Sequence, residues 1–172
     1  TSCVRGGQFP PRIADGAATV FGVDSVTAAE ILFLNQKDSE NNPLGVAPKI
    51  VLVPNALKVK AIQICNDLEL RDTTASTVRT TGNPHAGRFK PVASTYLSDS
   101  TITGYSSTAH YMLADPNDLA AIEVCFLNGQ QSPTIESAAA DFATLGIQLR
   151  GYHDWGVNLQ EYRAGVKSNG SA

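Results

Sequence analysis

The chain has few of the residues on which disulfide frameworks, metal sites and membrane spans depend. Its three cysteines, Cys3, Cys65 and Cys125, are odd in number and widely spaced, which excludes a disulfide framework and a paired CxxC metal site. No apolar stretch is long enough to span a bilayer, and the first residues lack the apolar run of a signal peptide. The sequence therefore predicts a protein made in a reducing compartment, the cytoplasm, where buried cysteine acts as a small apolar side chain.

Positive charge is also scarce. Thirteen Lys and Arg against 16 Asp and Glu give a net charge of −3, whereas non-specific binding to nucleic acid needs a surplus of cations. Nucleic acid is therefore not the expected main partner. A small basic group at Arg71, Arg79, Arg88 and Lys90 favours a solvated loop, with contact to DNA as the alternative.

No motif for cofactor or metal chemistry is present. A glycine-rich phosphate loop, a zinc-ligand spacing, a nucleophile elbow and an EF-hand loop are all missing, so we expect no cofactor and no metal. Cys125 stands in the apolar segment IEVCFL, where a buried, inert thiol is the better interpretation. Thr1 lacks the lysine or aspartate support that an amino-terminal nucleophile needs.

The three histidines have no convincing catalytic partner in the sequence. His85 stands in the turn NPHAG, where we expect a solvated side chain, and His110 stands beside Tyr111, where a hydrogen-bonded structural imidazole is favoured. His153 and Asp154 are the most suggestive pair, because a carboxylate can orient an imidazole. Adjacent strand residues point to opposite faces, however, so the two would not meet if the strand persists. A hydrolase that uses them is the least favoured function, and we expect no catalytic residue.

Two helices and a strand are predicted in the first half of the chain. Residues 1–26 show no clear period and are predicted to be an irregular lead-in. Thr27 and Glu30 stand at capping-box spacing, which predicts that a helix starts there and ends near Lys37.

The run IVLV at 50–53, between two prolines, predicts a central strand buried on both faces. Apolar residues at helical spacing then predict an amphipathic helix over 55–68, with Pro54 in its first turn. Two helices and a strand make 27–68 a small α/β layer. The threonine-rich stretch 69–88 is predicted to be a long exposed loop or a hairpin.

The second half is predicted to contain short strands separated by turn signals, which belong to a mostly antiparallel sheet. In the last of these strands Leu145, Ile147 and Leu149 alternate with Gly or polar residues, which predicts one buried face. The segments are FKPVASTYL, HYMLA, IEVCFL and LGIQLRGYH.

The ordered set of segments resembles a known family. TAAEILFLNQKDSENNPLG, PKIVLVPNAL, NPHAGRFKPVASTYLSD, YMLADP, IEVCFLNGQQSPTIE and RGYHDWGVNLQEYRAGVKSNG follow one another in this order. Together they closely resemble the carboxy-terminal portion of a tailed-bacteriophage major capsid protein, of the kind fused to or encoded after a prohead protease or found in prophages. The resemblance covers roughly residues 27–170, and IEVCFLNGQ and HDWGVNLQEYRAGVKSNG are its most specific parts.

The resemblance implies an α+β fold with an axial domain, a sheet flanked by helices, and strands of a peripheral domain. It assigns 27–172 to a capsid-like domain, with 27–90 mainly axial and 91–172 supplying the remaining axial and peripheral strands. The family's amino-terminal arm, extended loop and spine helix have no counterpart in 1–26. Because the chain also starts at Thr1 rather than at methionine, we expect a fragment or a processed product.

By this resemblance the protein is expected to be a structural subunit that self-assembles into pentamers and hexamers and then into a DNA-containing head, inside the bacterial host cytoplasm. An encapsulin-like shell subunit is the alternative. The implied partners are identical copies, a prohead protease and a portal, with packaged DNA touched only non-specifically and no membrane. Exposed aromatic or Arg side chains are expected to anchor the contacts between subunits. The candidates are Tyr105, Trp155, Tyr162 and Arg163.

Overall fold

The computed structural model describes residues 12–14, 20–72, 79–139 and 146–170. The chain divides into two compact units. Gln8–Ala121 and Glu161–Ala172 form the sheet unit, and Ile122–Gln160 form the body of the ribbon unit. Within the described ranges, no helix combines the length and the apolar character that crossing a membrane requires.

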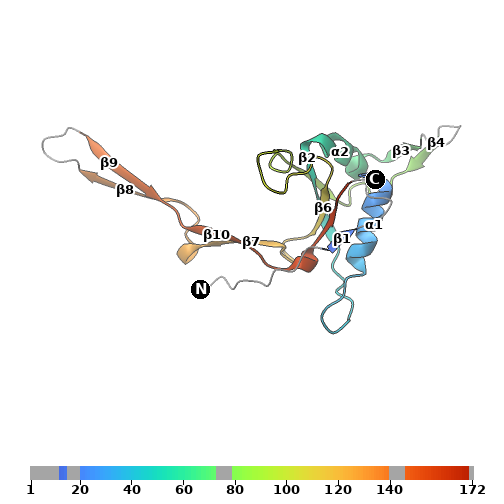
Figure 1. The fold of residues 1–172 in the computed structure, drawn as a ribbon, viewed down its shortest axis with the longest axis horizontal. Helices are drawn as coiled ribbons and strands as arrows, with labels where there is room; N and C mark the ends of the chain where they lie inside the picture. The colour runs from blue at the N-terminus through green and yellow to red at the C-terminus, as the bar shows by residue number, and fades with distance from the viewer. Residues whose placement is uncertain (1–11, 15–19, 73–78, 140–145, 171–172) are drawn as a thin grey trace. The chain divides into compact units, whose positions relative to one another are not determined.

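A five-stranded mixed sheet forms the centre of the sheet unit (Figure 1). From one edge to the other its strands are β1 (Arg12–Ala14), β11 (Gly165–Ser168), β6 (His110–Ala114), β2 (Pro48–Pro54) and β5 (Lys90–Ser94). β6 is antiparallel to both of its neighbours, whereas β1 and β5 run parallel to the strands beside them. Because β6 and β11 are neighbours in the sheet, the ribbon unit is an insertion between two paired strands.

The core of the sheet unit lies on one face of this sheet. Val51, Met112 and Val166 stand opposite one another on β2, β6 and β11, and all three are buried. Two helices cover this face: α1 (Val23–Leu34) contacts β1 and β11, and α2 (Lys58–Asn66) contacts β2 and β5. The α/β layer predicted from the sequence is therefore confirmed, but the prediction that β2 is buried on both faces is wrong. Ile50 and Leu52 are partly exposed because both helices pack on the opposite face.

α1 starts one turn earlier than predicted. Gly22 is its N-cap residue, and the Ser25 hydroxyl accepts a hydrogen bond from the Gly22 N–H at 2.9 Å. Thr27, predicted as the cap, lies within the helix, where its hydroxyl donates to the Val23 carbonyl at 2.9 Å. A capping-box spacing in the sequence cannot exclude a start one turn upstream when that turn also offers a hydroxyl. The helix ends at Leu34, three residues before the predicted end near Lys37.

α2 agrees with the prediction in its centre and differs at its ends. Ala61, Ile64 and Cys65 are buried against the sheet, as the apolar spacing indicated. Pro54 closes β2 and caps a short 3₁₀ helix, η1 (Asn55–Leu57), that leads into α2. Leu68, predicted to be on the buried face, is 79% exposed because the helix ends at Asn66.

The stretch 69–88, predicted to be an exposed loop or a hairpin, forms a hairpin only up to Gly82. β3 (Glu69–Asp72) pairs with β4 (Arg79–Gly82) in antiparallel register. Its apical residues 73–78 lie outside the described residues.

The ribbon unit consists of two antiparallel strand pairs, and the inner pair is nested in the chain between the two strands of the outer pair (Figure 1). β7 (Ile122–Phe126) pairs with β10 (Trp155–Leu159), and β8 (Thr134–Ala139) pairs with β9 (Ile147–Tyr152). Strands were correctly predicted within all four segments of the second half, but their assignment to one mostly antiparallel sheet is wrong. β5 and β6 belong to the five-stranded sheet, whereas β7 and β9 take partners, β10 and β8, that were not predicted.

Candidate functional site

The pair β7–β10 has one face made only of apolar side chains. Its register places Trp155 opposite Phe126 and Leu159 opposite Ile122. Residues directly opposite in an antiparallel pair share a face, and alternate residues along each strand share it as well. The apolar ribbon face therefore consists of Ile122, Val124, Phe126, Trp155, Val157 and Leu159.

The pair β8–β9 is divided in the same way. On one face, which we call the apolar tip face, Ile135 stands opposite Gly151, Leu149 opposite Ser137, and Ile147 opposite Ala139. The other face is polar. There Glu136 stands opposite Arg150 and accepts a hydrogen bond from its Nε at 2.9 Å.

Both apolar faces are exposed to solvent. Trp155 is 60% exposed, Leu159 67% and Ile147 76%. The predicted buried face of the last strand is therefore wrong at Ile147 and Leu149, and Leu145 lies outside the described residues. Burying one large apolar side chain stabilises by about 1.5–3 kcal/mol, and a two-stranded ribbon alone is marginally stable in water. An uncovered apolar area of this kind is typical of interaction surfaces.

Only part of this surface was foreseen in the sequence. Trp155 was named as an anchor, but the rest of β10 was not assigned to a strand. The signal was present: apolar residues at Trp155, Val157 and Leu159 alternate with Gly156 and Asn158. This continues the odd-numbered alternation of Ile147 and Leu149, the period of a strand.

The other predicted anchors lie in the sheet unit. Tyr105, in the loop between β5 and β6, is 53% exposed. Tyr162 and Arg163 lie together in a short 3₁₀ helix, η3 (Tyr162–Ala164), and are only partly exposed. The Arg163 guanidinium stacks 4.8 Å from the centre of the Tyr162 ring and lies 3.7 Å from the Glu161 carboxylate. Both side chains line a polar surface pocket of about 520 Å³ together with residues of the 35–41 loop.

The residues weighed for catalysis do not form a catalytic pair. His153 stacks on Phe126 with ring centres 5.7 Å apart, and its Nε2 is buried with no hydrogen-bond partner in the described part of the chain. Among the described residues, no ion pair joins His153 to Asp154. Cys125, predicted to be buried, is partly exposed and lies on the face of β7–β10 opposite the apolar ribbon face. Thr1 lies outside the described residues, among which no cluster of potential metal ligands occurs.

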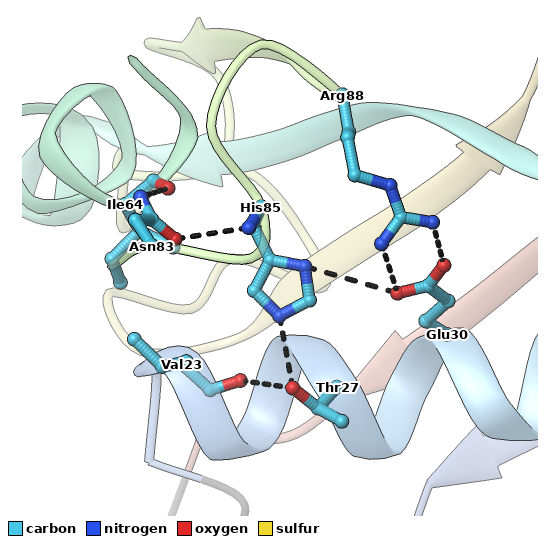
Figure 2. A network of polar contacts seen from close by, with 7 residues as sticks. All are labelled: Val23, Thr27, Glu30, Ile64, Asn83, His85 and Arg88. Atoms are coloured by element: carbon cyan, nitrogen blue, oxygen red, sulfur yellow. Dashed lines mark hydrogen bonds and ion pairs between the residues drawn. The ribbon is translucent and has the colours of Figure 1, made fainter. Parts of the chain in front are cut away.

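His85, predicted to be solvated, is instead 2% exposed and lies in a polar cluster between α1 and the loop after β4 (Figure 2). Its Nε2 lies 2.9 Å from the Thr27 hydroxyl oxygen. That hydroxyl already donates to the Val23 carbonyl, so we assign the hydrogen between the two side chains to Nε2 of a neutral imidazole. Nδ1 of this tautomer carries no proton and lies 3.8 Å from the Glu30 carboxylate.

The loop around His85 fastens both helices to each other. The Arg88 guanidinium donates two hydrogen bonds to Glu30 of α1, one of them at 3.2 Å. The Asn83 amide donates to the Ile64 carbonyl at 2.7 Å, and the Gly87 N–H donates to the Cys65 carbonyl at 2.7 Å. These bonds satisfy carbonyls that the end of α2 leaves unpaired. We call Asn83–Arg88 the clasp. Because the Arg88 guanidinium is already paired with the Glu30 carboxylate, Arg88 is not an unpaired positive charge that could bind DNA.

Burial lowers the pKa of His85 below the ordinary 6.5, and the nearby Arg88 acts in the same direction, while the Glu30 carboxylate opposes them. Burial likewise lowers the pKa of His110, whose ring packs edge-on against Phe21 at 4.9 Å. The predicted structural position of His110 on a strand is correct, but within the described residues neither of its ring nitrogens has a hydrogen-bond partner. Both histidines are thus favoured in the neutral form by the folded chain.

We predict that the sheet unit loses stability as pH falls below about 6.5. A histidine with a lowered pKa in the folded state takes up its proton more readily after unfolding, so the free energy of unfolding decreases from about pH 6.5 downward until the folded-state pKa is passed. Urea unfolding followed by circular dichroism between about pH 8 and pH 5 measures this. His85→Gln and His110→Gln should each reduce the pH dependence. A wild-type stability that is flat or rises on acidification in this range would contradict the prediction.

The comparison with protein families decides what kind of protein carries these surfaces. A family model described as "Phage capsid protein" matches residues 6–168, nearly the whole chain. The chain belongs to the phage capsid protein family. Searches of curated proteins and of solved structures found no match. This capsid protein is a structural component of the virion capsid and not an enzyme, which confirms the expectation drawn from the resemblance. The mixed α+β architecture is confirmed as well.

Proposed function

We propose that this capsid protein is a shell subunit that joins identical copies into rings of five or six and then into an icosahedral head that holds DNA. One observation supports the proposal beyond family membership: the ribbon unit leaves two apolar faces uncovered in the single chain. A monomeric protein rarely exposes so large an apolar area. Repeated contacts between different surfaces of identical copies can close into rings, which is the association a shell needs.

Different parts of the chain are assigned to the axial and the peripheral domain of the shell subunit. Residues 27–90 are assigned mainly to the axial domain, and 91–172 to the rest of that domain and to the peripheral strands. Residues 1–26 were predicted to be an irregular lead-in, but they contain strand β1 of the sheet and the start of helix α1. The sheet with its two helices, and a strand insertion between β6 and β11, support this division. Prohead protease and portal remain the implied further partners, and packaged DNA is touched non-specifically.

The contact anchors are proposed in two groups. Trp155 and Tyr105 are supported by their exposure, since an anchor must reach a partner. Tyr162 and Arg163 are supported by their position at a polar pocket, where Arg163 can receive a carboxylate.

Assembly of the purified chain is the direct test. Sizing chromatography with light scattering, combined with electron microscopy over a wide range of protein concentration, should show rings or shells that increase with concentration. A chain that stays monomeric at every concentration would contradict the proposal. Closed shells that enclose a protein cargo rather than DNA, when isolated from a host, would instead favour the encapsulin-like alternative.

A further inference from the structure

In β9 and β10, the apolar side chains of the apolar tip face and of the apolar ribbon face follow the same alternating pattern. Ile147 and Leu149 of β9 and Trp155, Val157 and Leu159 of β10 all occupy odd-numbered positions. The strands are interrupted only at 153–154, and the ring of His153, also at an odd position, stacks on Phe126 of the apolar ribbon face. The odd-numbered side chains therefore stay on the same side of the chain from β9 to β10. As a result, the apolar tip face continues into the apolar ribbon face.

We propose that these faces receive the same faces of a second copy of this chain, so that two ribbons stack as the layers of a small β-sandwich. The inference rests on the proposed function, because it names the surface through which identical copies meet. Two sheets stack face to face at about 10 Å with interdigitating side chains. A face that meets its own counterpart gives a two-fold contact, the commonest symmetry between identical subunits. Such a contact joins copies in pairs, so it adds to the contacts between different surfaces that close the rings.

The amount of apolar surface fits a second copy. Eight large apolar side chains on the two faces are about half to three-quarters exposed. Full burial of one such side chain removes roughly 60–120 Å² of apolar surface from water, so the eight together offer roughly 450 Å² of exposed apolar area per copy. This is the apolar share of a standard interface, which buries about 800 Å² per partner with somewhat more than half of it apolar.

The distribution of charge also permits two copies to meet. Glu123, Glu136 and Arg150 all lie on the opposite faces of their strand pairs. Stacking the apolar faces therefore buries no ionised side chain, and the desolvation cost of a buried charge does not arise. A strongly charged partner would find no counterpart on these faces.

Trp155 provides a direct readout, because it is the only tryptophan in the chain. Its fluorescence emission is expected to be that of a solvated indole in dilute protein and to shift to shorter wavelength as association sets in. Val157→Lys places a cation beside Trp155 on the apolar ribbon face and should weaken association at least tenfold. Gln148→Lys makes the same charge change on the polar face of β9 and should leave association within about twofold of wild type.

The outcomes separate this surface from the proposed function. Because Val157 is 56% exposed, Val157→Lys should unfold like wild type in urea, and this is checked first. If particles form while Trp155 stays solvated and Val157→Lys assembles normally, the surface is wrong and the shell function stands. If the wild-type chain never associates, the proposed function fails too. A shielded Trp155 in a chain that is strictly monomeric would show a cover from within the chain and would overturn the proposal.

Discussion

Replacing Met112 with alanine is expected to lower the free energy of unfolding of the sheet unit by about 2–4 kcal/mol. Met112 is 1% exposed and stands between Val51 and Val166 in the centre of the sheet. Truncation removes apolar contacts and leaves a cavity beneath both helices, because α1 and α2 are fastened to each other by the clasp and cannot close the gap freely. Urea unfolding followed by circular dichroism gives the change.

Two variants of the same strand control this experiment. Met112→Leu conserves volume and should cost less than about 1.5 kcal/mol. Leu113→Ala removes a side chain that points to the partly exposed face and should cost clearly less than Met112→Ala. An alanine variant at Met112 within about 0.5 kcal/mol of wild type would show that the core is not centred on this strand.

Gly170→Ala is expected to cost about 2–4 kcal/mol, although it adds one methyl group. Gly170 is buried and has φ of +68°, a conformation that alanine adopts with strain. A Cβ at this position would also lie well inside van der Waals contact of the Thr108 backbone. Backbone atoms cannot move aside by a change of rotamer, so relief requires the chain after β11 to leave its place. That movement also breaks the 3.1 Å hydrogen bond from the Thr108 hydroxyl to the Asn169 carbonyl.

Gly45→Ala separates the two causes. Gly45 has nearly the same φ, +66°, but nothing lies within 4 Å of its added Cβ. The backbone strain alone should therefore cost about 1 kcal/mol. If both alanine variants lose the same stability in urea unfolding, the close approach to Thr108 contributes nothing and the explanation given for Gly170 is wrong.

The elements that were predicted well are those defined by short-range patterns. β6 coincides with HYMLA and β7 with all but the last residue of IEVCFL, because aromatic or branched residues between turn signals favour strands locally. The centre of α2 follows from apolar residues at helical spacing. The start of α1 was missed by one turn because the N-cap is Gly22, which has no capping side chain, and the Ser25 hydroxyl instead accepts the Gly22 N–H.

The candidate site was predicted only in part, since exposure is not a local property. Trp155 was named as an anchor, yet the strand around it was not recognised. His85 was expected in solvent because it follows a turn, whereas α1, nearly 60 residues earlier in the chain, packs over it and supplies Thr27 and Glu30. A contact between residues so far apart in sequence leaves no periodic signal near either of them.

The sequence by itself determined the class of protein, because its ordered set of segments resembles phage capsid proteins and the family comparison matches nearly the whole chain. Local chemistry suffices to predict individual helices and strands, because propensity, periodicity and turn residues act over a few neighbours. Only the tertiary structure decided that β6 and β11 are partners around the ribbon insertion, that His85 is buried, and that the alternating strands of the ribbon unit are uncovered. Burial depends on which distant segments pack together. A strand with alternating apolar and polar residues has the same sequence pattern whether its apolar face packs on the core of its own chain or is left exposed.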